Sequence, residues 1–274
     1  MMKIIAALLI CAAAACAQDA GERVNVPLTD PSRPVRVHAQ LMLGGITVRG
    51  TNTNQVMVET RAEPGHGSHE HERPIPPNAA GMHRIDGGVL SGLDIVEQDN
   101  LVTIKTTSWN RHADLVITVP HHASLQLKAM NDGLIDVEQV DGEIDADSLN
   151  GRIILKNVSG SVLAHCLNGE IVATLDQVDS SKPMAFSTLN GDIDVTLPDS
   201  VRANVRMKTD NGEIYSDFDI KLEGGSHVVT SDPGEREHGH RIRLDKTIHG
   251  TINGGGPDYQ FTSLNGQIYI RKRK

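Results

Sequence analysis

Aromatic side chains are scarce in this sequence, which has three Phe, three Tyr and one Trp among 274 residues. Large rings supply much of the buried area of an ordinary globular core. Their scarcity therefore favours a thin core of stacked aliphatic residues, of the kind that repeat proteins build.

Cysteine is also rare, and its positions exclude a disulfide framework. Cys11 and Cys16 fall in or beside an apolar N-terminal segment, so the mature domain carries Cys166 alone. A nucleophilic cysteine needs a partnering base, and the adjacent His165 points to the opposite face of a strand. We interpret Cys166 as a small side chain near a bend.

The one long apolar run is too short to span a membrane. Residues 1–17 combine Lys3, an apolar stretch and a small-x-small site around Cys16, which predicts a secretory signal. Two alternatives stay open: soluble export with Gln18 as first residue, or lipid attachment at Cys16, because residues 13–16 approximate a lipobox. Both predict a protein of the periplasm, the cell envelope or the exterior, membrane-bound only if Cys16 is lipidated.

A net charge of −9 argues against nucleic acid as a partner. Several catalytic and binding motifs are missing as well: a phosphate-binding glycine loop, His-Glu-x-x-His and Gly-x-Ser-x-Gly. The glycine-rich nonapeptide that binds Ca²⁺ is not matched either. No cofactor and no catalytic residue is therefore predicted.

Glycine, in contrast, recurs at a fixed spacing of nine residues. Each glycine is followed by apolar residues at the second, fourth and seventh positions, a pattern with period two and then a bend. Asn, Asp and Gly at the bends favour tight turns. The glycines of this uninterrupted array are Gly133, Gly142, Gly151, Gly160 and Gly169.

Two nine-residue phrases make one turn of a coil, because nine residues are too few to surround an aliphatic core. Val-type bends alternate with Leu-Asn-Gly bends, and later copies follow after 22 and 21 residues. The prediction is an all-β solenoid with about 18–22 residues per rung. Further turn glycines are Gly191, Gly212 and Gly266, and stacked asparagines are expected at Asn150, Asn168, Asn190, Asn211 and Asn265.

The domain organisation follows from where the repeat starts and stops. We predict a linker over residues 18–34, the solenoid over 35–270 and a basic solvated tail over 271–274. The first copy, near residues 44–48, is expected at the capping end, and the last two copies at residues 249–252 and 264–270. Loop inserts are expected near 62–92 and 224–240 because both stretches are polar and break the strand pattern.

The first insert holds a histidine cluster. His66, His69 and His71 could bind Zn²⁺ or Cu²⁺ through neutral imidazoles. Their spacing matches no closed site, so we favour unliganded histidines in a polar loop and predict no metal.

At this point the sequence resembles the bacterial exported "putative adhesin" domain of unknown function. The resemblance lies in residues 114–120, which read Asp-Leu-Val-Ile-Thr-Val-Pro, and in the Leu-Asn-Gly-x-Ile phrases at 189–193 and 264–268. It extends from about residue 35 to residue 270. It implies a β-solenoid or roll, export and no established catalytic residues.

Acidic residues also recur in the repeat and suggest a second hypothesis. A β-helix can carry a polysaccharide hydrolase or lyase whose catalytic groups are paired carboxylates. The acids occupy outward positions, however, so solvation alone explains them. We therefore expect a non-enzymatic envelope module that binds a protein or a glycan or serves as a scaffold. The acids are Glu143, Glu170, Asp192, Glu213, Asp136, Asp145 and Asp194.

Overall fold

The computed structural model describes residues 23–61, 92–106, 112–131, 133–223, 228–231, 241–244 and 247–274, and these contain strands and no helix. The predicted all-β solenoid is confirmed. The first eleven strands are β1 (Arg23–Val26), β2 (Val35–Leu43), β3 (Ile46–Thr51), β4 (Val56–Arg61), β5 (Leu93–Gln98), β6 (Leu101–Thr106), β7 (Asp114–Pro120), β8 (Ala123–Asn131), β9 (Ile135–Glu138), β10 (Asp141–Asn150) and β11 (Ile153–Asn168). The others are β12 (Ile171–Val178), β13 (Met184–Asn190), β14 (Ile193–Leu197), β15 (Ala203–Asn211), β16 (Ile214–Ser216), β17 (Lys221–Leu222), β18 (Val228–Ser231), β19 (Arg241–Leu244), β20 (Ile248–Ile252), β21 (Asp258–Asn265) and β22 (Ile268–Lys272).

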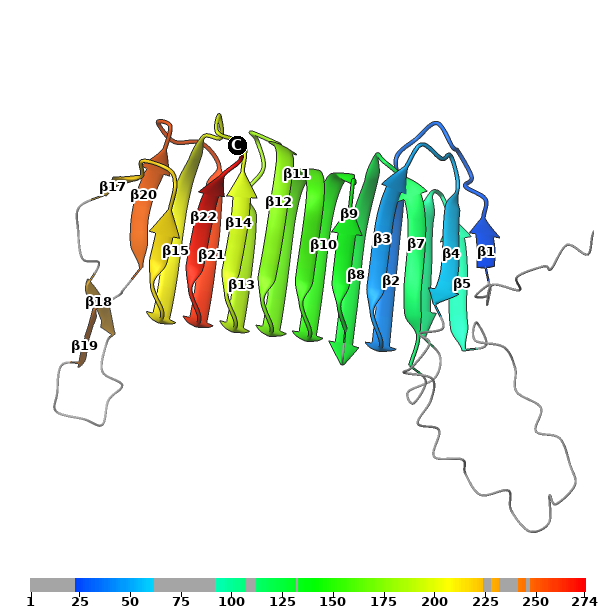
Figure 1. The fold of residues 1–274 in the computed structure, drawn as a ribbon, viewed down its shortest axis with the longest axis horizontal. Coiled ribbons are helices and arrows are strands. Elements are labelled where there is room, and N and C mark those ends of the chain that lie inside the picture. The colour runs from blue at the N-terminus through cyan, green and yellow to red at the C-terminus, as the bar shows by residue number, and fades with distance from the viewer. Residues whose placement is uncertain are drawn as a thin grey trace, which may run out of the picture.

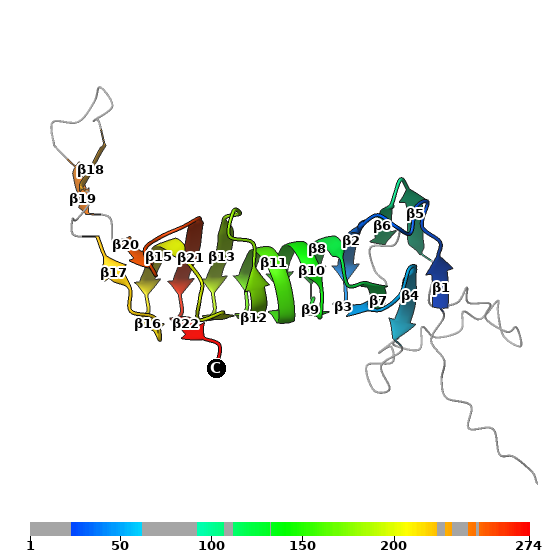
Figure 2. The ribbon, with the colours of Figure 1, turned by 90° about the horizontal axis from the view of Figure 1, so that it is seen from above.

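The chain coils so that its strands, apart from β18 and β19, form two facing sheets (Figures 1 and 2). Sheet I contains, in spatial order, β5, β6, β2, β8, β10, the second half of β11, β13, β21, β15, β20 and β17. Sheet II contains β1, β4, β7, β3, β9, the first half of β11, β12, β14, β22 and β16. Parallel pairing with an 18-residue offset, as in Ile144 opposite Val162, fixes the rung length in the centre.

The core lies between the sheets and consists of the second and fourth residues of each phrase. Ile135, Ile153, Ile171 and Ile193 follow one another in register and are fully buried. Among the scarce aromatics, the rings of Phe186 and Phe261 stack inside with centroids 5.4 Å apart. Burial of this continuous aliphatic column stabilises the coil, since roughly 25 cal/mol is gained per Å² of apolar surface.

A segment near each end of the described chain inserts into the stack. The rung of β2 and β3 lies between β6/β7 and β8/β9, and the rung of β21 and β22 lies between β13/β14 and β15/β16. In Figure 1 the blue pair accordingly lies among green strands and the red pair among yellow ones. The first repeat copy is thus an internal rung, and its predicted place at the capping end is wrong.

Antiparallel strands close the ends instead. β1 and β4 pair antiparallel at the N-terminal end of sheet II, and β5 pairs antiparallel with β6 in sheet I. The linker predicted for residues 18–34 is therefore wrong from Arg23 onward, because β1 belongs to this cap. β20 pairs antiparallel with β15 and β17, so residues 249–252 are a cap strand rather than a repeat copy.

Two further boundaries differ from the prediction. Arg271 and Lys272 belong to β22 rather than to a solvated tail, and Arg271 forms an ion pair with Asp194 of the neighbouring rung. The predicted loop 224–240 contains β18, which pairs with β19 in a separate two-stranded sheet. The predicted signal 1–17, Cys16, His66, His69 and His71 lie outside the described residues.

Candidate functional site

Asparagines form a continuous ladder along one bend, which we call the Asn corner: the turn from sheet I to sheet II. Each side-chain amide donates to the side-chain oxygen of the adjacent rung, over 2.7–3.2 Å. Rung insertion sets the order, so Asn265 lies between Asn190 and Asn211. From the N-terminal side the ladder is Asn131, Asn150, Asn168, Asn190, Asn265 and Asn211.

A second ladder lies just inside the Asn corner. Cys166 occupies one of its positions, and its thiol donates to the carbonyl oxygen of Gly151 over 2.9 Å. Burial raises the pKa of the Cys166 thiol, which keeps it protonated and unreactive. His165 is exposed, on the opposite face. The equivalent donors to glycine carbonyls on other rungs are Ser148, Thr188, Ser263 and Thr209.

Glycine is required at the Asn corner because successive rungs approach closely there. A Cβ atom on Gly169 would lie 2.0 Å from the carbonyl oxygen of Gly151. The same clash with a stacked backbone oxygen occurs at Gly151, Gly191, Gly212 and Gly266. Gly133 also turns at this corner, where its Cβ would meet Ala129, whereas Gly142 and Gly160 lie at the opposite bend.

The leucines of the Leu-Asn-Gly phrases are not core residues, although the repeat placed them among the apolar positions. Leu149 is 36% exposed, whereas Val140 and Val158, at the equivalent position of the other bend, are buried. The reason is strand parity. The residue before each leucine points inward and is a donor of the inner ladder, so the leucine itself points outward.

The acidic residues of the repeat are dispersed over both outer faces. Asp136 pairs with Lys156 over 3.0 Å, and Glu170 pairs with Arg152 over 2.7 Å, each from rung to rung. Three further acids accept hydrogen bonds from neighbouring rungs: Asp145 from Gln126, Asp192 from the Gln267 backbone and Asp194 from Arg271. Glu213 accepts from the Tyr215 hydroxyl in its own rung. Glu143 lines a groove.

That groove crosses the bend opposite the Asn corner, which we call the Val corner: the turn from sheet II to sheet I, as at residues 139–142 and 157–160. It has a volume of about 390 Å³ and runs over three consecutive strands of sheet I, namely β8, β10 and β11. Its lining is polar and small, and consists of Pro34, His122, Ala123, Ser124, Asp141, Gly142, Glu143, Ser159, Gly160, Ser161, Gln177, Val178, Asp179 and Lys182.

Two turns with the same sequence pattern flank this groove. Asp30-Pro-Ser-Arg-Pro34 leads into β2, and Asp179-Ser-Ser-Lys-Pro183 leads into β13. In both, the aspartate side chain accepts from the serine backbone N–H over 3.0 Å and from its hydroxyl over 2.6 Å. In both, the next backbone N–H donates to the aspartate carbonyl over 3.2 Å. These serine hydrogen bonds hold the pKa of Asp30 and Asp179 below its usual range.

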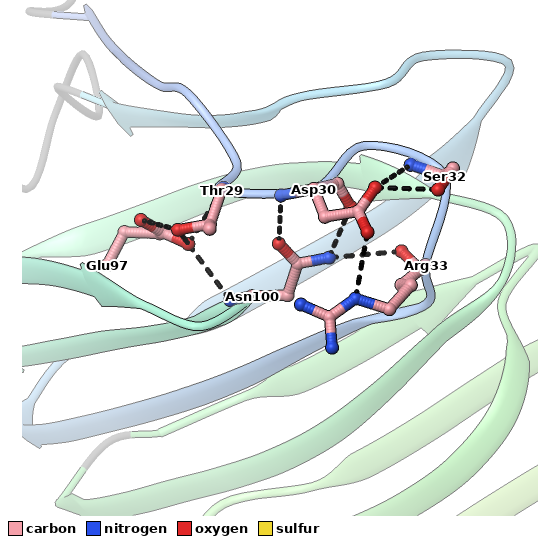
Figure 3. A network of polar contacts seen from close by, with 6 residues as sticks. All are labelled: Thr29, Asp30, Ser32, Arg33, Glu97 and Asn100. Carbon is pink, nitrogen blue, oxygen red and sulfur yellow. Dashed lines mark hydrogen bonds and ion pairs between the residues drawn. The ribbon is translucent and has the colours of Figure 1, made fainter.

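The first of these turns is fixed by a polar network (Figure 3). Asn100 is buried, accepts from the Asp30 backbone N–H over 2.8 Å and donates to the carbonyl oxygens of Asp30 and Arg33. Glu97 accepts from both the backbone and the hydroxyl of Thr29, which lowers its pKa. The turn is therefore rigidly attached to the hairpin of β5 and β6.

The groove has a hydroxyl in its floor that the protein leaves unused. Ser161 is only 5% exposed, lines the groove and has no hydrogen-bond partner for its side chain within the described part of the chain. Polar side chains lie above it: His122 is 2.9 Å from Asp141, and Lys182 pairs with Glu143 over 3.5 Å. The site is thus polar, and its three carboxylates outnumber its single lysine.

Of the groove residues, only Glu143, as an acid, and Gly142 and Gly160, as turn glycines, were singled out from the sequence. A signal was present, because the pattern Asp-x-Ser-Lys/Arg-Pro occurs twice, at residues 30–34 and 179–183. The two copies are far apart in the chain and do not follow the nine-residue spacing. Only the insertion of β2 next to β8 brings them to the same corner.

The described residues contain no group of three or more His, Cys, Asp or Glu side chains arranged to hold a metal ion. They also include no helix with the length and apolar character of a membrane span.

Comparisons with known proteins found a matching family model and similar solved structures. Residues 123–253 match the model of the family described as Toastrack DUF4097. The chain is similar to the solved structure of a "putative cell adhesion protein" from Clostridium sporogenes ATCC 15579, at 9% identity and TM-score 0.48, covering 92% of this chain and 100% of that one. It is also similar to a "putative adhesin" from Bacteroides fragilis NCTC 9343, at 9% identity and TM-score 0.36, covering 92% and 96%. No curated protein matches the chain.

Proposed function

We propose that this chain is an exported, non-enzymatic solenoid module that binds an envelope ligand, in an adhesin-like or scaffolding role. The observation that carries the proposal is the groove at the Val corner with Ser161 in its floor. A volume of about 390 Å³ is within the range of ligand sites. A largely buried hydroxyl without a protein partner is available to a ligand at no cost to the fold.

Three carboxylates line the groove, which is the specific observation in favour of a polysaccharide hydrolase or lyase. Such an enzyme needs a carboxylic acid with a raised pKa to protonate the leaving group. The hydrogen bonds from Ser181 lower the pKa of Asp179 instead, Glu143 pairs with Lys182, and Asp141 lies within hydrogen-bond distance of His122. Binding therefore explains the groove better than catalysis.

Sedimentation with a bacterial envelope preparation tests this function. We expect saturable retention of the mature chain with no release of reducing sugars or unsaturated products over many hours. Release of either product, lost on Glu143→Gln, would establish the enzyme instead. Failure to bind would contradict the proposed module.

A separate measurement tests export. We propose that residues 1–17 direct the chain out of the cytoplasm, and the mass of the mature N-terminal peptide distinguishes Gln18 as first residue from an acylated Cys16. A chain that retains Met1 and remains inside the cell would contradict export.

A further inference from the structure

We infer that the groove binds a linear, uncharged saccharide that lies along the solenoid axis between the two Asp-x-Ser-Lys/Arg-Pro turns. This inference rests on the proposed binding function and names the chemical class of its ligand. It follows from the repetition of the groove floor, from the acceptor groups of its carboxylates and from the way its two ends are formed.

The groove floor repeats from rung to rung. Glu143 lies opposite Ser161 in the pairing of β10 with β11, and Ser124 precedes Leu125, which lies opposite Ile144. Ser124, Glu143 and Ser161 thus form one row across three strands, with a spacing of roughly 4.8 Å between neighbours. A row of alternating hydroxyl and carboxylate groups at constant spacing suits a polymer that presents hydroxyls at regular intervals.

The acceptor groups of the groove favour a ligand that presents hydroxyls over a cationic one. Lys182 pairs with Glu143, His122 lies 2.9 Å from Asp141, and the Asp179 carboxylate accepts two hydrogen bonds from Ser181. A cationic peptide would gain little from ion pairs with these exposed carboxylates, because exposed pairs contribute little free energy. Sugar hydroxyls can donate to the remaining acceptor positions of the same carboxylates without breaking those pairs.

The twin turns define where the ligand starts and stops. Pro34 and Lys182 line the groove from the turns before β2 and β13, and three strands lie between those elements. The separation of β2 and β13 is four strand spacings, or roughly 19 Å. Both turns are held by internal hydrogen bonds, so the ends of the groove are formed before any ligand binds.

The test measures retention of the full mature chain on a bacterial envelope preparation after treatment of that preparation with periodate or with a protease. Periodate cleaves sugars that carry neighbouring hydroxyls, whereas a protease removes proteins. We expect periodate treatment to abolish retention and protease treatment to leave it unchanged. We also expect less than twofold change in retention between about 50 mM and about 500 mM salt, since an uncharged ligand makes no screened ion pair.

Two variants tie retention to the groove. Ser161→Ala removes one neutral hydrogen bond and should weaken binding about 2- to 10-fold. Ser161→Leu fills the floor and should abolish binding. Ser187→Ala is the matched control, because Ser187 lies on the outer face of β13 outside the groove, and it should bind like the wild type. Circular dichroism establishes that each variant is folded.

The outcomes separate this inference from the function on which it rests. Retention that is lost after protease, survives periodate and still depends on Ser161 would overturn the saccharide but keep the binding module. Retention that falls steeply with salt would likewise replace the saccharide by a cationic partner. Retention that neither Ser161 variant alters would overturn the groove as the site, and no retention at all would overturn both proposals.

Discussion

The two corners of the solenoid treat polar groups in opposite ways. At the Asn corner each amide of the ladder bonds to the next rung, and hydroxyls and a thiol satisfy the glycine carbonyls behind it. At the Val corner the chain leaves a groove, and the Ser161 hydroxyl has no side-chain partner among the described residues. One corner is closed by its own hydrogen bonds, and the other is open to a ligand.

The difference shows where a repeat protein can vary. The rung between Gly169 and Gly191 is four residues longer than an 18-residue rung, and residues 179–182 form the turn that flanks the groove at the Val corner. From Asn150 to Asn211 the Asn corner keeps a constant length, because an added residue would disturb both ladders and the close contact at each glycine. In this part of the coil the variation lies at the Val corner, where it builds a site.

The largest expected effect comes from the core that joins the two corners. Ile153→Asp places a charge in the buried column of β11 and should cost more than about 4 kcal/mol in the free energy of unfolding, or prevent folding. Leu163→Asp is the control, since Leu163 is 43% exposed on the same strand, and it should cost less than about 1 kcal/mol. Denaturant unfolding measures both. Equal losses would mean that the inward and outward faces are reversed.

Gly169→Ala should break the Asn corner. Its Cβ would lie 2.0 Å from the Gly151 oxygen, so the rungs must separate, at a cost of about 2–4 kcal/mol. Glu170→Ala, at the adjacent exposed position, should change stability by less than about 1 kcal/mol. If Gly169→Ala left the free energy of unfolding unchanged, the rungs at the Asn corner would have room for a Cβ atom.

Alkaline pH should destabilise the core around Tyr259. Burial, together with the charge of Asp179, raises the pKa of Tyr259 to about 12, whereas the unfolded value is near 10. Stability is thus full below about pH 10 and falls as pH rises toward 12, by about 2–3 kcal/mol. Tyr259→Phe should abolish this dependence without loss at pH 7, because the buried hydroxyl has no partner. Thermal unfolding of the wild type and of Tyr259→Phe, measured as a function of pH, tests this prediction. If the variant lost as much stability at alkaline pH as the wild type, the assignment to Tyr259 would be wrong.

Asn168→Ala should have a smaller effect at the Asn corner. The variant loses the hydrogen bond to Asn150 and the one from Asn190, worth together about 1–3 kcal/mol. Asn211→Ala removes one such bond at the end of the ladder and should cost about half as much. Chemical denaturation compares the two variants. Equal losses of stability would argue that the hydrogen bonds of the ladder do not contribute additively.

Ser161→Ala should have the smallest effect on stability. The hydroxyl has no partner in the described part of the protein, so its removal should change the free energy of unfolding by less than about 0.5 kcal/mol or raise it slightly. In the same denaturation series, Asn168→Ala should lose more stability than Ser161→Ala. That difference would show that the Asn corner stabilises the fold, whereas the Val corner is available for binding. A loss above 1 kcal/mol would indicate a structural role.

The central array was readable from sequence because its information is local. Nine-residue glycine spacing and strand parity placed Ile135, Ile153 and Ile171 in one column and Asn150 beside Asn168, as the structure has them. The ends were misread for a physical reason. Cap strands such as β20 carry the same short alternating pattern as rungs, and only their partners make them antiparallel.

The sequence by itself determined the β-solenoid, its rung length and its aliphatic column, because these follow from side-chain periodicity within one or two turns of the coil. The order of the rungs and the groove were decided only by the tertiary structure. Residues 35–51 and 258–272 fill gaps between rungs far away in the chain, where their edges complete parallel ladders. Unpaired strand edges drive that insertion, and no local pattern specifies which gap is filled. The same insertion brings the turn at residues 30–34 into position opposite the turn at 179–183 and so creates the site.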